Sequence, residues 1–429
     1  MNALKLYLQP RILVIFFLGF SSGLPLALTA STLGVWLMES GVNTVAIGVF
    51  AAVATPYNLK FLWSPLMDGL PFPILSKILG YRRGWLVATQ LTLAGSLILL
   101  GFTHPSINPW FTALAALLVA VCSASQDIVI DAYRVELLSP SQQGAGAATI
   151  VLGYRLGMIA SRAGALTLAT YMSWPMTYVI MAALMGVGIV TALLAPEPEA
   201  SAEKKALITE KQTIGSWLNE HVVAPFADFM TRPQWLTILL FILLYKLADA
   251  FMGLMPNLFY LQLGFSKEQI AGVSGIYGII ATIVGGFIGG AIIPRLGMVK
   301  SLWVCGIAHA LTNLMFVAQA KIGADVGFLM FSITLENITG GMGTVAFVAF
   351  ISSLTHAQFT ATQYALLSSL SAIGRTWLST PAGWFVEKLG WSEFFLLAAA
   401  LAIPGLIILW RLNKQLTYQT NTASGAATS

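Results

Sequence analysis

Charged residues are scarce in this sequence of 429 residues. Asp, Glu, Lys and Arg together make up 9% of the chain, whereas soluble domains carry about 25%. Cysteine is rarer still, because the chain has only Cys122 and Cys305, which lie far apart inside apolar runs. These shortages exclude a soluble globule, a disulfide scaffold, a nucleic-acid-binding domain and a disordered tail protein. With 57% hydrophobic residues, the composition leaves a polytopic helical membrane protein.

Long apolar runs recur along the whole chain. A helix needs about 20 apolar residues to cross a bilayer, and runs of that length predict twelve membrane-spanning helices. The first is too long for the core of a cleaved signal peptide, so we expect it to be a span. The predicted spans are residues 12–38, 45–67, 85–103, 109–133, 145–171, 174–195, 234–263, 269–293, 301–319, 326–353, 361–386 and 392–410.

The basic residues between the spans are unevenly distributed. If the N-terminus lies inside, 14 Lys and Arg residues fall on the inner side and 3 on the outer side. Because basic residues are enriched in cytoplasmic loops, we expect both termini to lie in the cytoplasm. The basic pI of about 9.1 then reflects membrane topology and gives no sign of acidic partners.

The spans form two groups of six around a charged segment. We predict an N-terminal half (1–195), a cytoplasmic linker (196–232), a C-terminal half (233–412) and a flexible cytoplasmic tail (413–429). The linker reads either as a solvated connection or as an amphipathic helix at the membrane surface.

Residue matches between the halves indicate an internal duplication. Leu79-Gly80 in the first half corresponds to Leu296-Gly297 in the second. The spacing from Gln143 to Arg155 also equals that from Gln363 to Arg375. Two parallel six-helix halves predict an all-α, pseudo-symmetric major facilitator fold.

Nine ionisable residues lie inside the predicted spans. Each costs roughly 2.5–3.5 kcal/mol in hydrocarbon unless water, a partner or a substrate meets it. We therefore expect most of them to face a wet cavity between the two halves. They are Lys60, Asp127, Asp131, Arg155, Arg162, Lys246, Asp249, Glu336 and Arg375.

Asp127 and Asp131 are four residues apart, so they share one helical face. Asp131 with Arg134 and Glu136 reads as a structural cluster at the cytoplasmic end. Asp127 lies one turn deeper, after Gln126, which favours proton carriage or ligand contact.

Two further carboxylates are candidates for carrying a proton. Glu336 has no basic neighbour in its own helix, and burial without a partner favours the protonated form. Asp249 is three residues from Lys246, so the two form either a neutral structural pair or a breakable coupling pair.

Cationic side chains suggest an anionic ligand. Arg155 and Arg162 are seven residues apart, hence on one face of the predicted span 145–171, and Arg375 is the counterpart of Arg155. Guanidinium groups in a shared cavity can bind carboxylates bidentately, although an ion pair between Arg155 and Asp127 is the alternative. Lys60 either joins this set or extends towards the inner boundary.

No catalytic motif occurs in the structural setting that it needs. Gly19-Phe20-Ser21-Ser22-Gly23 matches the nucleophile-elbow pattern, but it lies inside a span and not in a strand–turn–helix. The sequence also has no HExxH motif, P-loop or Cys/His metal spacing. We expect no enzyme activity, no metal and no cofactor, while Gly23 and Pro25 predict a kinked helix that lines a cavity.

Several segments resemble the AmpG-type muropeptide permeases of the major facilitator superfamily. Asp68 followed by Arg82 and Arg83 is also similar to the loop signature of that superfamily. The matching segments are 19–25 (GFSSGLP), 56–68 (PYNLKFLWSPLMD), 125–134 (SQDIVIDAYR), 153–155 (GYR), 244–250 (LYKLADA), 336–343 (ENITGGMG) and 371–375 (SAIGR).

The resemblance implies proton-driven import of N-acetylglucosaminyl-1,6-anhydromuramyl peptides from periplasm to cytoplasm. It places the chain in the inner membrane of a Gram-negative bacterium, in cell-wall recycling, and links it to β-lactamase induction and antibiotic resistance. The partners would be this substrate, protons and the lipid bilayer, with no nucleic acid, and we expect a monomer. A carrier for another anionic or drug-like solute, working by symport or antiport, and a membrane enzyme or non-transporting sensor are the alternatives.

The resemblance and the residue chemistry together predict three groups of site residues. The proton-coupling group is Asp127, Glu336 and Asp249. The substrate-binding group is Lys60, Gln126, Tyr154, Arg155, Tyr245, Lys246, Asn337 and Arg375. The structural or gating group is Gly23, Pro25, Asp68, Arg82, Arg83, Asp131 and Arg134.

Overall fold

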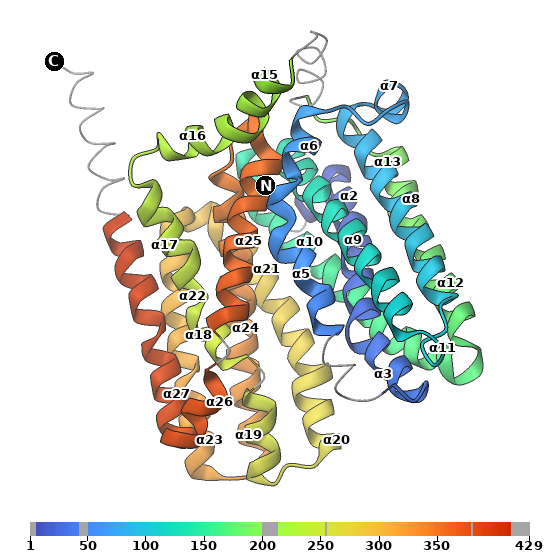
Figure 1. Cartoon of the computed structure of the whole chain (residues 1–429). Coiled ribbons are helices and arrows are strands. Elements are labelled where there is room, and N and C mark those ends of the chain that lie inside the picture. Colours follow the sequence, from blue (N-terminus) through green and yellow to red (C-terminus); the bar gives the residue numbers. More distant parts are fainter. Residues whose placement is uncertain (1–5, 43–49, 200–212, 254, 379–380, 413–429) are drawn as a thin grey trace, which may run out of the picture. The chain divides into compact units, whose positions relative to one another are not determined.

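The structure is a computed structural model in which the described residues are helices and their connections, with no strand among them (Figure 1). It describes residues 6–42, 50–199, 213–253, 255–378 and 381–412. The predicted tail at 413–429 and the most charged part of the predicted linker lie outside these ranges.

Within the described ranges, nine helical segments are long and apolar enough to cross a membrane. Nine of the predicted spans overlap them, and the predicted total of twelve and the orientation of the termini stay predictions. The nine segments are Pro10–Glu39, Tyr81–Gly101, Pro109–Leu137, Trp174–Leu194, Trp235–Leu263, Glu268–Leu296, Met298–Ile322, Val326–Ser353 and Trp391–Leu412.

The chain divides into two compact units. Unit 1 comprises Met1–Ala227 and Ile351–Ser369, so the connection between α24 and α25 packs with the N-terminal residues. Its helices include α2 (Pro10–Thr29), α3 (Ser31–Glu39), α5 (Thr55–Leu59), α6 (Ser64–Gly69), α7 (Leu75–Leu79), α8 (Tyr81–Gly101), α9 (Pro109–Leu137), α10 (Gln143–Ile159), α11 (Ala165–Tyr171), α12 (Trp174–Leu184), α13 (Gly186–Leu194) and α15 (Ile214–Leu218), and α16 (Ala224–Met230) begins in it.

Unit 2 comprises Asp228–Phe350 and Leu370–Ser429. Its core is strongly aromatic, with Phe251, Phe259, Phe316 and Phe394 among its buried side chains. Its helices are α17 (Trp235–Tyr245), α18 (Leu247–Met252), α19 (Met255–Leu263), α20 (Lys267–Ile270), α21 (Gly278–Leu296), α22 (Met298–Thr312), α23 (Leu314–Ile322), most of α24 (Val326–Ser353), the second half of α25 (Thr360–Leu378), α26 (Ala382–Leu389) and α27 (Trp391–Ala400).

Glycines let α2 and α10 approach closely in unit 1. A Cβ on Gly23 would collide with the backbone of Tyr154, and a Cβ on Gly157 would collide with the backbone of Phe20. Small residues at such positions let two helix backbones approach closely. Pro25 lies inside α2, and the helix breaks at Ala30, whose φ of −120° and ψ of −96° are not helical.

The predicted span 45–67 is not one continuous helix. Its described part consists of the 3₁₀ turn η1 (Phe50–Ala54), α5, a second turn η2 (Lys60–Leu62), and α6, which has Pro65 in its first turn. Proline has no N–H to donate, so Pro56 and Pro65 favour new helix starts over a continuous helix. Hydropathy located this segment but could not reveal its breaks.

Two other spans differ from a straight helix. The predicted span 234–263 is interrupted at Lys246 and again at Gly253, whose φ is +45°. A π-helical turn, η4 (Ala160–Gly164), interrupts the predicted span 145–171. The extra residue in a π turn changes the direction in which the neighbouring side chains point. Arg162 lies in this turn and is exposed, whereas Arg155 is half-buried, and the expectation that they share a face stays a prediction.

The first turn of α8 also differs from prediction. The helix begins at Tyr81 and not at residue 85, so Arg82 and Arg83 are helical. Gly80 precedes it with φ +109°, and Gly297 precedes α22 with φ +78°. The matched glycines of the two halves therefore adopt the same kind of left-handed turn before a helix.

Candidate functional site

Asp127 lies on α9 in unit 1 and has a single described hydrogen-bond partner. The Ser22 hydroxyl of α2 donates to its Oδ1 at 2.6 Å. Lys60 and Asp131 are the nearest charged groups that act on it. Asp127 is therefore a half-buried carboxyl without a direct ion pair among the described residues, an arrangement in which a proton can be gained or lost. Within this described part, the alternative ion pair with Arg155 is not present.

One helical turn along α9, Asp131 lies between two cations. Its carboxylate is 3.8 Å from Lys60 Nζ and 3.7 Å from Arg134 Nη2. Arg134 is fully buried, donates to the Ser352 hydroxyl at 3.0 Å and lies 5.4 Å from the centre of the Tyr364 ring. These contacts support the predicted structural role of Asp131 and Arg134. Lys60 is also buried, and its amine faces Asp131.

The predicted ligand contacts in unit 1 have different environments. Gln126 is fully buried, and neither atom of its amide has a hydrogen-bond partner among the described residues. A ligand could reach Gln126 only in a different conformation of unit 1. Arg155 and Tyr154 are half-buried on α10, and the described part of the chain offers Arg155 no hydrogen bond or ion pair. Their roles stay predictions.

An apolar cavity of about 370 Å³ lies at the α3 end of α2. Leu26, Leu33, Phe50 and Tyr57 contribute to its walls. The volume is within the range of small-molecule sites, but the lining has no cationic group among the described residues. Tyr57 in this wall is half-buried.

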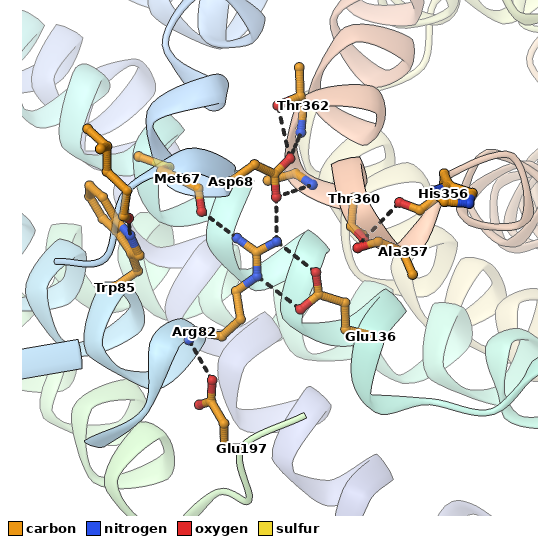
Figure 2. Close-up of polar contacts among 12 residues, drawn as sticks. Met67, Asp68, Arg82, Trp85, Glu136, Glu197, His356, Ala357, Thr360 and Thr362 are labelled. Atoms are coloured by element: carbon orange, nitrogen blue, oxygen red, sulfur yellow. Dashed lines mark hydrogen bonds and ion pairs between the residues drawn. The ribbon is translucent and has the colours of Figure 1, made fainter. Parts of the chain in front are cut away.

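A buried charge network surrounds Arg82, as Figure 2 shows. The guanidinium is fully buried and donates from Nη2 to Asp68 at 2.6 Å and to Glu136 at 2.7 Å. Its Nε donates to the other oxygen of Glu136 at 3.0 Å, and its Nη1 donates to the Met67 carbonyl at 2.7 Å. Glu136 therefore pairs with Arg82, which the start of helix α8 brings to this position.

The same network reaches the start of α25 within unit 1. Asp68 accepts from the backbone N–H of Ala361 at 3.3 Å and of Thr362 at 2.7 Å, and from the Thr362 hydroxyl at 2.9 Å. A carboxylate at a helix N-terminus satisfies free N–H groups and favours the helix dipole. Asp68 thus ties α6, α8 and α25 together, in keeping with its predicted structural role.

The sequence did not identify Glu197 as part of this network. Its two oxygens accept the backbone N–H groups of Arg82, at 2.8 Å, and Arg83, at 3.1 Å, and so cap α8. The Arg83 side chain in turn donates to the carbonyls of Ala192 and Leu193 at the end of α13. A negative cap offsets the unfavourable position of two arginines in a first helical turn. The Pro-Glu-Pro-Glu sequence marked this segment as charged, but nothing in it indicated a helix 115 residues away.

We expect Glu197→Gln to change how stability depends on pH. Burial raises the pKa of the Glu197 carboxyl above its usual 4.5, although hydrogen bonds from the α8 backbone oppose the rise. The folded protein therefore holds this proton more tightly than the unfolded chain, and the resulting stability is lost as the pH rises through the folded pKa. The Gln variant lacks this loss, so its melting temperature in detergent should rise relative to wild type between about pH 4 and pH 7. A wild-type advantage that grows over this range would contradict the assignment.

In unit 2, Lys246 and Asp249 form the pair that their spacing suggested. Lys246 Nζ lies 2.7 Å from Asp249 Oδ2 and also donates to the Thr344 hydroxyl at 3.3 Å. Lys246 occupies the break between α17 and α18. Broken helices at membrane depth occur where the backbone is buried in protein or lines a cavity.

Most of the other predicted site residues in unit 2 make hydrogen bonds within the protein. The Asn337 amide donates to Glu336 at 2.8 Å and accepts from the Thr282 hydroxyl at 2.8 Å. The Tyr245 hydroxyl donates to the Leu302 carbonyl at 2.9 Å. Arg375 lies in α25, but its side chain is outside the described part of the structure. The proton-coupling or substrate-binding roles stay predictions for Glu336, Asn337, Tyr245 and Arg375.

Comparisons with known proteins fit this architecture. The model of the Major Facilitator Superfamily matches residues 14–379. The chain is 42% identical over 417 residues to "Anhydromuropeptide permease" of Escherichia coli K12, which covers 97% of this chain and 82% of that protein. It is 38% identical over 417 residues to "Putative transporter AmpG 4" of Rickettsia conorii, covering 97% of this chain and 99% of the relative.

The fold is also similar to a solved transporter. The proton:xylose symporter XylE superposes with a TM-score of 0.66 at 12% identity, over 96% of each chain. The predicted all-α major facilitator fold is confirmed, and because these relatives are permeases and transporters, the expectation that the chain is not an enzyme is confirmed as well. The chain is a polytopic membrane transporter: it belongs to the major facilitator superfamily and, within it, to the family of AmpG-type permeases.

Proposed function

We propose that the chain imports N-acetylglucosaminyl-1,6-anhydromuramyl peptides from the periplasm to the cytoplasm together with protons. The observation that carries this proposal is the 42% identity, over 97% of the chain, to a protein named anhydromuropeptide permease. The location would be the inner membrane of a Gram-negative bacterium, and the role would be cell-wall recycling. The imported fragments would also serve β-lactamase induction, and hence antibiotic resistance, as the family resemblance implies.

The proposed mechanism is alternating access between two six-helix halves. The halves would be residues 1–195 and 233–412, joined by a cytoplasmic linker at 196–232 and followed by a tail at 413–429. The transporter would act as a monomer, without a metal or cofactor, because the proton gradient drives accumulation. Proton and substrate would each be bound in one exposure of the site and released in the other.

Asp127 is the proposed proton carrier, with Asp249 and Glu336 as the other candidates. The support is its position deep in α9, with a serine hydroxyl as partner and no direct counter-charge among the described residues. Arg155 is the proposed contact for a peptide carboxylate, because a guanidinium binds carboxylates bidentately and this one is half-buried. Lys60, Gln126, Tyr154, Tyr245, Lys246, Asn337 and Arg375 complete the proposed set of substrate contacts.

Uptake into proteoliposomes tests the proposal. We expect an imposed inward proton gradient to drive accumulation of labelled N-acetylglucosaminyl-1,6-anhydromuramyl tripeptide, and a protonophore to abolish it. Unlabelled substrate should compete, whereas the free tripeptide should not. Uptake no greater than in protein-free liposomes would contradict the proposal, and efficient competition by unrelated organic anions would indicate a carrier with a different substrate.

A further inference from the structure

Two polar side chains in unit 2 converge on the carboxylate of Asp249. Asp249 accepts from Lys246 on one oxygen, at 2.7 Å, and its other oxygen lies 2.5 Å from His309 Nε2. His309 is on α22, sixty residues along the chain from Asp249. The exposed fraction of the side chain is 19% for Lys246, 31% for Asp249 and 12% for His309. The proposed transport mechanism gives His309 no part.

Glycines on α24 make room for this cluster. A Cβ on Gly340 would come within 3.3 Å of His309 Cε1, and a Cβ on Gly343 would lie 3.8 Å from Lys246 Nζ. Larger side chains at Gly340 would press on the imidazole ring. Gly340 therefore leaves space for the imidazole ring, whereas a side chain at Gly343 would only touch Lys246.

The second nitrogen of His309 has a partner that suits either protonation state. His309 Nδ1 lies 3.1 Å from the Thr339 hydroxyl, which also lies 2.9 Å from the Leu335 carbonyl. When the imidazole is neutral, Thr339 can donate to Nδ1. When it is protonated, Nδ1–H can donate to Thr339, whose proton then turns to the Leu335 carbonyl. The site can thus gain or lose a proton on His309 without leaving a buried polar group unpaired.

The surrounding charges favour such a proton. The groups that face His309 from the packed helices are Asp249, Lys246 and Glu336, with Cys305 and Tyr245 nearby. Asp249 lies directly against the ring, 2.5 Å from Nε2, so an ionised Asp249 can pair with a charge on the imidazole. A cavity of about 20 Å³ beside Lys246, Asp249 and His309 has room for one water molecule, through which a proton can reach the ring.

We propose that His309 is a proton-binding residue that controls the release of Lys246 from Asp249 and thereby makes binding of an anionic substrate pH-dependent. A protonated imidazole supplies Asp249 with a second counter-charge, so Lys246 can leave for a carboxylate of the substrate without leaving Asp249 unpaired. Repulsion between the two cations favours that step. This inference rests on the proposed function insofar as the substrate carries peptide carboxylates.

Equilibrium binding of labelled N-acetylglucosaminyl-1,6-anhydromuramyl tripeptide to the purified full-length protein tests the inference without any gradient. We expect the wild-type affinity to weaken about fivefold or more between pH 6 and pH 8, the range in which histidine changes charge. The affinity of His309→Gln should equal the weak affinity of the wild type at pH 8, and it should change by less than about twofold between pH 6 and pH 8. His104→Gln, at an exposed loop histidine, is the matched control and should behave as wild type.

A second pair of variants covers the case in which His309→Gln fails to fold. Thr339→Val removes the hydroxyl that bonds the ring in both protonation states. Because a hydrogen bond to a charged group is stronger than one to a neutral group, the variant loses more from the protonated ring, and the midpoint of the pH dependence should fall by about one unit. Thr339→Ser keeps the hydroxyl and should leave the midpoint in place.

The outcomes separate this inference from the proposed function. The same pH dependence in His309→Gln as in wild type, or an unchanged midpoint in Thr339→Val, would overturn the role of His309 alone. Absence of substrate binding by the wild type at every pH would instead contradict the proposed function.

Discussion

Asp127→Asn should abolish proton-driven accumulation of substrate while exchange of substrate across the membrane continues. Asparagine keeps the size of the side chain and an oxygen that can accept from Ser22, which donates to Asp127 at 2.6 Å, but it cannot carry a proton. An inward gradient of one pH unit supplies about 1.4 kcal/mol per proton, which is about tenfold in accumulation. The variant should lose this whole factor, so its internal substrate concentration should only equal the external one.

Asp131→Asn is the matched control for this prediction, because it lies one turn away on the same helix. Its carboxylate is held between Lys60 and Arg134, so we expect lower stability but continued accumulation. Uptake and counterflow in the same proteoliposomes measure the two properties separately. Normal accumulation by Asp127→Asn would assign the proton to another carboxyl, with Glu336 and Asp249 the next to be tested.

Arg82→Ala should cause the largest loss of stability. The substitution leaves Asp68 and Glu136 without the guanidinium that contacts both of them at 2.7 Å or less. Removing one partner of a buried ion pair costs about 3–5 kcal/mol, because an uncompensated charge stays buried. Thermal unfolding in detergent and the yield of folded protein measure the effect.

Two further variants serve as comparisons for the stability of Arg82→Ala. Arg82→Lys keeps the charge but cannot make the same set of directed hydrogen bonds, so its stability should be intermediate. Arg11 is exposed, and Arg11→Ala should unfold at the wild-type temperature. A melting temperature of Arg82→Ala equal to that of wild type would show that the buried network does not stabilise unit 1.

The sequence predicted those features that depend on neighbours along the chain. Apolar run length located the membrane helices, and the spacing of Lys246 and Asp249 suggested a contact that the structure places at 2.7 Å.

Features that depend on long-range placement could not be predicted in this way. His309 and Glu197 reach their partners across 60 and 115 residues, and no local spacing encodes such a contact. The helix break at Lys246 was also missed, because hydropathy reports the apolarity of a run and not its backbone angles. The pair of Glu136 with Arg82 was also missed, because it forms where α8 packs on α9, 54 residues apart in the chain.

Proton movement coupled to substrate is the most direct measurement of the proposed function. Proteoliposomes containing the purified protein and an internal pH-sensitive dye are diluted into buffer at equal pH, and labelled N-acetylglucosaminyl-1,6-anhydromuramyl tripeptide is then added outside. Proton-coupled import predicts that the lumen becomes more acidic as substrate enters, and that Asp127→Asn shows no such change. Substrate entry into wild-type proteoliposomes without acidification of the lumen would contradict the account.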